Sequence, residues 1–171
     1  KLGGMYSGKI YLIGTEKGVG VRNAGHIGAS AGDVVIDTNG RVINKNSIQA
    51  SQSVELLATK NIENTDTAKI LAHKGNIKLN SKKSVEQSGV VGAKQHIKIS
   101  ADRLAQTKTG EIQGGNVRIQ VADTVTNRGL ISSRQENDDK AKNVIKAKTI
   151  ENVGTGRIYG DHVALHAIQL I

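Results

Sequence analysis

The chain has 171 residues, which suffices for one domain with a sizeable core but is short for two. It contains no Cys, Phe, Trp or Pro, which excludes disulfides and thiolate metal sites and leaves Ile, Val, Leu and Ala to build the core. The formal net charge of +9 favours anionic partners, and no apolar run nears the roughly 18 residues of a membrane span.

The first element of a repeated unit is a short strand in which apolar and polar residues alternate. It appears first at residues 9–14 and six more times along the chain. The alternating aliphatic pairs are Ile10/Leu12, Val34/Ile36, Val54/Leu56, Ile77/Leu79, Ile97/Ile99, Val117/Ile119 and Val163/Leu165. Alternation with a period of two is typical of a half-buried strand.

The second element places an aliphatic residue two positions before an amide. The seven amides are Asn23, Asn44, Asn64, Gln87, Gln106, Asn127 and Asn152. They recur at intervals of 19 to 25 residues, so the unit is about twenty residues long. Stacked amides at a corner can donate to the next coil and accept from the previous one, which predicts a structural amide ladder.

The third element is an aliphatic residue that leads into Ala, Gly or Ser, as in residues 26–30 and 69–73. Three short strands in twenty residues can wind as stacked coils, with equivalent strands paired in parallel about 4.8 Å apart. The pattern therefore predicts an all-β fold, a right-handed parallel β-helix of seven to eight coils with three short strands per coil.

We expect residues 1–171 to form a single β-helix segment, a fragment of a much longer chain. The charged run at residues 134–143 is predicted to be a loop inserted before the seventh unit. In that unit Val144 and Ile145 fall outside the register extrapolated from earlier units. Open coil ends would expose unpaired backbone edges, so the isolated chain is expected to associate end to end unless irregular residues cover them.

The run from Leu2 to Ser30, together with the repeats, resembles the haemagglutinin repeats of filamentous haemagglutinin and related exoproteins of two-partner secretion. The resemblance implies export through an outer-membrane transporter and a secreted or cell-surface location on a Gram-negative bacterium. It also implies a role as a segment of the elongated shaft of an adhesin or contact-dependent inhibition effector, which presents a distal binding or toxic domain.

No residue pattern indicates catalysis, a cofactor or a metal. His162 and His166 would lie about 13 Å apart on a strand, which is too far for one zinc ion. Gly18, Gly20 and Gly25 have the wrong spacing for a phosphate loop, and the acids form no column at equivalent positions. We therefore expect that the protein is not an enzyme, with a carbohydrate-active β-helix enzyme as the weakest alternative.

A stronger alternative is a glycan- or receptor-binding module that acts through an outer face of the helix. Lys78, Lys98 and Arg118 occupy the same position in three consecutive units, which predicts a basic stripe that could meet acidic glycans or a target-cell receptor. The chain lacks the aromatic residues on which single-stranded nucleic acids stack, so nucleic acid is not an expected partner.

Overall fold

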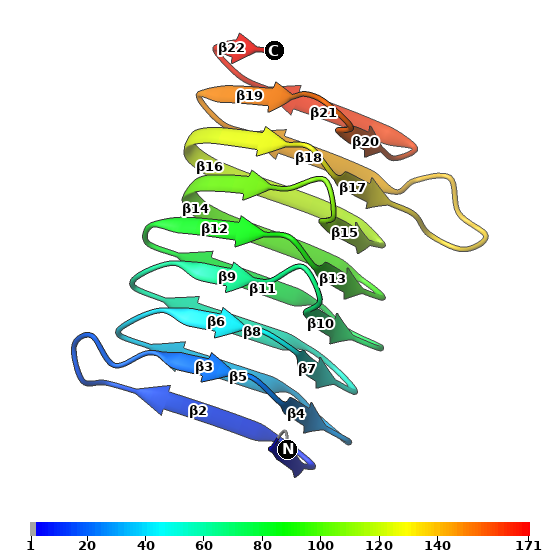
Figure 1. The fold of residues 1–171 in the computed structure, drawn as a ribbon. Coiled ribbons are helices and arrows are strands. Elements are labelled where there is room, and N and C mark those ends of the chain that lie inside the picture. Colours follow the sequence, from blue (N-terminus) through cyan, green and yellow to red (C-terminus); the bar gives the residue numbers. More distant parts are fainter. Residues whose placement is uncertain (1–2) are drawn as a thin grey trace.

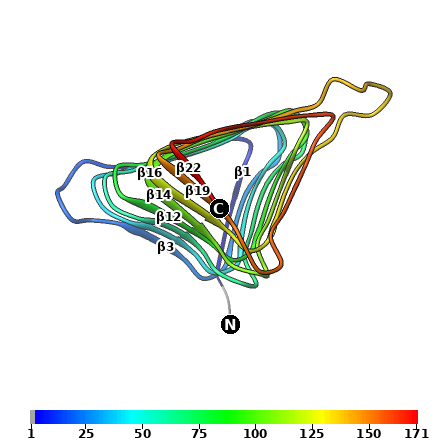
Figure 2. The same ribbon diagram turned by 90° about the horizontal axis from the view of Figure 1, so that it is seen from above.

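The computed structural model describes residues 3–171, so Leu2, which begins the run that carries the resemblance, lies outside the described residues. The described residues form 22 β-strands that wind into a solenoid, with the N-terminal turn at one end and the C-terminal turn at the other (Figure 1). Seen along its axis the solenoid is triangular and right-handed (Figure 2). Residues 3–171 contain no helix that is long and apolar enough to cross a membrane.

Two parallel sheets account for the strands, and their register repeats once per turn. One is an eight-stranded sheet built from the third element of each unit, so the chain makes about eight turns. Its strands, in spatial order, are β1 (Gly4–Ser7), β4 (His26–Ala29), β7 (Ser47–Ala50), β10 (Lys69–Ala72), β13 (Val90–Ala93), β15 (Glu111–Gly114), β17 (Leu130–Ser133) and β20 (Arg157–Tyr159). The predicted parallel β-helix is confirmed.

The other sheet combines the first and second elements of the units. The first elements are β2 (Ile10–Gly14), β5 (Val34–Thr38), β8 (Val54–Ala58), β11 (Ile77–Ser81), β18 (Lys142–Lys146) and β21 (His162–His166). The second elements are β3 (Val21–Asn23), β6 (Val42–Asn44), β9 (Ile62–Asn64), β12 (Ser84–Gln87), β19 (Thr149–Asn152) and β22 (Gln169–Leu170). In two turns both elements belong to one long strand, β14 (His96–Gln106) or β16 (Asn116–Asn127).

The long strands arise because the corner between the two elements shortens from the first turn to β14 and β16, and it reopens between β18 and β19. The first turn spends residues 15–20 on this corner, whereas in β14 and β16 the chain bends within the strand and the register shifts between Ala101 and Arg103. A short irregularity in a strand bends it without a loop. The corner is therefore a kink in these two turns and a loop in the first.

The core is a stack of aliphatic side chains that point into the triangle. One column runs through Ile36, Leu56, Leu79 and Ile99, which lie in register and are at most 1% exposed. Another runs through the third elements from Ile27 to Ile131. Because identical medium-sized side chains recur at each level, one turn packs on the next without bulky rings.

In the seventh unit, Ile145 lies in the same register as the inward aliphatic residues of the earlier units, contrary to the expectation for Val144 and Ile145. Ile145 pairs with Ile119 and is fully buried, whereas Val144 pairs with Arg118 and faces outward. The aliphatic position next to Val117 is taken by Asn143, which is also fully buried. Its Nδ2 donates to the carbonyl oxygens of Ile131 and Tyr159, at 3.1 and 2.9 Å. Because a polar residue occupies this aliphatic position, the first element of the seventh unit is not recognisable from the sequence.

Candidate binding surface around the residue 134–141 excursion

Between β17 and β18, residues 134–141 leave the solenoid and extend well beyond its triangular outline (Figure 2). The excursion is a tight hairpin, because Gln135 and Asp138 form an isolated antiparallel bridge and Asn137 adopts a left-handed backbone conformation with φ of 57°. Asn tolerates this conformation better than most residues. The excursion is therefore a tight turn that projects outward from one corner of the solenoid.

A column of polar side chains ties the excursion to the solenoid. It runs along the corner between the third and first elements, where each side chain caps a backbone N–H of the next turn. The Asp33 carboxylate accepts from Ser53 N at 2.9 Å, the Ser53 hydroxyl from Asn76 N at 3.0 Å, and the Asn76 amide from His96 N at 2.9 Å. This outer column is not recognisable in the sequence, because its members share a position and not a residue type.

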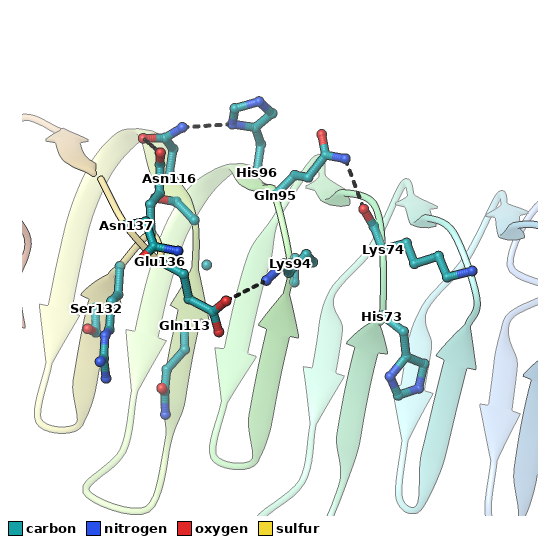
Figure 3. A pocket seen from close by; sticks show the side chains of 15 residues that line it. His73, Lys74, Lys94, Gln95, His96, Gln113, Asn116, Ser132, Glu136 and Asn137 are labelled. Atoms are coloured by element: carbon teal, nitrogen blue, oxygen red, sulfur yellow. Dashed lines mark hydrogen bonds and ion pairs between the residues drawn. The ribbon is translucent and has the colours of Figure 1, made fainter. Parts of the chain in front are cut away.

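Asn116 continues the outer column and holds the base of the excursion. Its Oδ1 accepts from the backbone N of Lys142 at 2.9 Å and from Nε2 of Gln135 at 3.1 Å. Its Nδ2 lies 3.1 Å from Nδ1 of His96 (Figure 3). The chain thus leaves and rejoins the solenoid around a single amide side chain.

A polar groove lies on the third-element side of the excursion. It encloses about 1130 Å³ and crosses several turns, and Figure 3 shows the side chains that line it. Glu136 turns from the excursion into this groove, where its carboxylate lies 3.8 Å from Nζ of Lys94. Across the floor, Gln95 donates to the carbonyl oxygen of Lys74 at 2.9 Å. The groove therefore presents fixed amides and one exposed ion pair.

A second, smaller groove of about 460 Å³ lies on the first-element side of the excursion. It is lined by four cationic side chains, Lys98, Arg118, Lys140 and Lys142, all of which are exposed. The predicted basic stripe leads into this groove. Lys78, Lys98 and Arg118 pair in register on β11, β14 and β16. Nζ of Lys78 lies 3.9 Å from Oε1 of Glu55, so the carboxylate reduces the charge at that end of the stripe.

The predicted amide residues lie together on the inner side of another corner, where the second element ends. Each of the first six donates to the amide oxygen in the next turn, and Asn152 is the last acceptor. The distances are 2.9 Å for Asn23 to Asn44, 3.0 Å for Asn44 to Asn64, 2.9 Å for Asn64 to Gln87, 3.3 Å for Gln87 to Gln106, 2.8 Å for Gln106 to Asn127 and 2.9 Å for Asn127 to Asn152. All donors are less than 9% exposed. The amide ladder thus runs the length of seven turns.

The six buried amides also donate to a backbone carbonyl of the next third element, and Asn23, Asn44, Gln87 and Asn127 donate in addition to a carbonyl of their own corner. Asn64 donates to the carbonyl oxygen of Val90, and Gln87 donates to those of Gly89 and Glu111. The corner is so tight at Gly89 that a Cβ there would collide with the carbonyl oxygens of Thr65 and Ala68. The ladder and the glycine therefore fix the same bend, in keeping with a structural role.

The residues weighed for metal chemistry remain apart. His162 and His166 both lie on β21, exposed and in register with Lys142 and Lys146. Within residues 3–171 no group of three or more His, Cys, Asp and Glu side chains could hold a metal ion.

Glu86 and Glu63 lie side by side on β12 and β9. Partial burial raises the pKa of Glu86, and the negative charge of Glu63 raises it further. A raised pKa means that the folded state binds the proton more tightly, so this contribution to stability is present below the ordinary value of 4.5 and is lost as the pH rises.

We expect Glu86→Gln to raise the free energy of unfolding at pH 7 by a fraction of about 1 kcal/mol, since it removes a repulsion between directly opposed like charges. Thermal unfolding from pH 3 to pH 8 measures this. The gain should vanish at the acid end, where Glu86 is protonated. A gain that grows as the pH falls would contradict the assignment.

The comparisons with known proteins identify relatives of one kind. The chain is 53% identical to Toxin CdiA of Yersinia pestis over 75 residues, which is 44% of the chain and 2% of that protein. It is 30% identical to Toxin CdiA of Escherichia coli over 145 residues, 75% of the chain and 5% of that protein. It is 26% identical to a tRNA nuclease CdiA of Yersinia mollaretii over 161 residues, 94% of the chain and 5% of that protein.

The chain therefore spans only a small part of the length of these relatives. No family model and no solved structure matches it. The expectation that the protein is not an enzyme is wrong on this evidence, because relatives carry the names of nucleases, among them the tRNA nuclease of Yersinia mollaretii. Composition and surface pattern could not reveal this, since they describe one segment of such proteins.

Proposed function

We propose that the chain forms part of the shaft of a contact-dependent inhibition exoprotein. The chain belongs to the family of filamentous haemagglutinin-type repeats and is related to CdiA toxins. The observation that supports this most directly is the continuous stack of about eight turns, with parallel ladders running along the whole axis. Such a stack resists bending, because any bend must break hydrogen bonds between successive turns.

In this proposal the shaft sets the distance between the bacterial surface and a distal binding or toxic domain. The exoprotein would leave the cell through an outer-membrane partner transporter and fold on the outside of a Gram-negative bacterium. The nuclease activity in the relatives' names is proposed for the exoprotein as a whole. A chain built from local turns suits this route, because each turn can pack on the previous one as it emerges.

The experiment deletes whole turns from the exoprotein that carries this segment. Removing residues 54–96 joins Ser53 to Ile97, which preserves the register because Val54, Ile77 and Ile97 are equivalent. We expect this variant to be exported and to inhibit target cells in contact. Removing residues 54–86 cuts within a turn and should abolish stable export. Equal behaviour of the two deletions would contradict a shaft that works through stacked turns.

A second candidate function is binding of a glycan or receptor through an outer face. It is favoured by the in-register pairing of Lys98 with Arg118 beside the excursion, because neither side chain has a carboxylate within 4 Å in residues 3–171. A glycan array probed with the whole chain tests it. Saturable binding supports a binding module, and a complete absence of binding leaves the shaft role alone.

A further inference from the structure

The groove between the basic stripe and the excursion is lined by cationic side chains from both. The stripe supplies Lys98 and Arg118 from neighbouring strands, the returning arm of the excursion supplies Lys140, and the start of β18 supplies Lys142. Equivalent positions in parallel strands are about 4.8 Å apart, so the first two cations repeat once per turn along the axis. The arrangement is a short row of positive charges with a wall on one side.

The cations of this groove are free to meet an external anion. The three ion pairs in residues 3–171 join Lys78 to Glu55, Lys94 to Glu136 and Arg103 to Asp123, so none involves a groove cation. Glu136, the acidic residue nearest the start of the excursion, turns into the opposite groove (Figure 3). Asp138 accepts a hydrogen bond from the backbone N of Lys140 at 2.9 Å, and no carboxylate in residues 3–171 lies within 4 Å of the Lys140 ammonium group.

The groove is also held in shape without a ligand. Asn116 fixes the backbone at Lys142, and Gln135 closes the other arm of the excursion onto Asn116 and onto the carbonyl oxygen of Gly115. Val144 lies beside Arg118 as a half-buried floor. A site whose walls are already ordered loses less entropy when it binds.

The lining distinguishes among anionic ligands. It has no Phe, Tyr or Trp on which a nucleic-acid base could stack, and its one imidazole, His96, lies 3.1 Å from the Asn116 amide. Within the described residues, large exposed apolar side chains lie towards the two ends of the solenoid, such as Tyr11 and Ile168, and none lines this groove, so little could insert into a membrane. A polysaccharide with charged groups on a flexible, hydroxyl-rich chain needs neither an aromatic ring for stacking nor apolar side chains for insertion into a membrane.

We propose that this groove binds a linear anionic polysaccharide, whose sulfate or carboxylate groups lie along the axis against Lys98, Arg118, Lys140 and Lys142. The inference rests on the second candidate function and assigns glycan binding to this groove. Arg118 can hold an anionic group with two parallel hydrogen bonds, and the lysines act as point charges. The excursion is the element that turns a charged strand face into a site.

The test measures binding of size-defined heparin fragments to the whole chain by surface plasmon resonance at several salt concentrations. We expect Lys98→Gln/Arg118→Gln, and separately Lys140→Gln/Lys142→Gln, to weaken binding roughly tenfold and to flatten its salt dependence, because fewer counterions are released. The matched control is Lys82→Gln/Lys83→Gln, which removes the same charge from two exposed lysines at another corner.

Three results would overturn the proposal. An equal loss in the control variant would show that only net charge matters, which leaves glycan binding intact but removes the groove. Tighter binding to vesicles of anionic phospholipid, or to single-stranded DNA of equal charge, would reassign the surface. No measurable heparin binding by the unaltered chain would remove both the groove and the second candidate function. The expected result is binding to heparin that the two groove variants weaken and the control does not.

Discussion

Replacing Leu56 by Ala is expected to lower the free energy of unfolding by about 3 to 4 kcal/mol, near the middle of the range for large-to-small substitutions in a core. Leu56 is fully buried and packs between Ile36 and Leu79 of the neighbouring turns. The cavity would open at the middle of a continuous column, where the turns above and below are held by backbone ladders and cannot collapse into it.

Denaturation in urea, followed by circular dichroism, measures this loss. The control is Leu57→Ala, which removes the same atoms from the next residue on the outer, half-buried face. We expect that control to cost less than about 1 kcal/mol. A Leu57 variant as unstable as the Leu56 variant would mean that the two faces of β8 have been assigned wrongly.

Replacing Asn64 by Leu is expected to destabilise the chain by about 2 to 4 kcal/mol, because it breaks a buried polar network in the middle. The Asn44 amide would lose its acceptor, and the Gln87 side-chain oxygen would lose its donor. The carbonyl oxygen of Val90 would lose a hydrogen bond as well. All three amide side chains are 1% exposed, so water cannot readily replace these partners.

Hydrogen exchange on the same variant shows which turns lose stability. We expect protection to fall at the corners of the turns on either side of Asn64 and to persist near Asn127, because each turn contacts mainly its neighbours. Asn64→Gln is the conservative control, since Gln87 and Gln106 hold equivalent positions in the same ladder. If Leu at position 64 were as stable as Gln, the ladder would be dispensable.

The part of this fold that the sequence predicts is the part in which residue type and position repeat together. Inward aliphatics such as Ile77 and Ile97 recur at one spacing because each must fill the same space at its own level. The corner amides were predictable for the same reason. A ladder needs a side chain that both donates and accepts, and Asn and Gln supply this through one compact, uncharged amide group.

What the sequence did not predict depends on geometry that varies from turn to turn. Asn143 interrupts an aliphatic column, and its Nδ2 donates to carbonyl groups of β17 and β20 that are distant in sequence, so no local signal places it inside. The outer corner column mixes acid, hydroxyl and amide groups, because any of these oxygens can accept from a backbone N–H. The two grooves depend on the direction in which the excursion leaves the solenoid, which its composition does not specify.

The central claim is that successive units lie in parallel and in register, and paired cysteines test it most directly, since the chain has no Cys of its own. Lys78 and Lys98 are register partners on the outer face, about 4.8 Å apart, within the range that a disulfide spans. We predict that Lys78→Cys/Lys98→Cys oxidises readily to an intramolecular disulfide. Lys78→Cys/Ser100→Cys, displaced by two residues to roughly 8 Å, should not. Rapid closure of the displaced pair, with no closure of the in-register pair, would contradict the stacked solenoid.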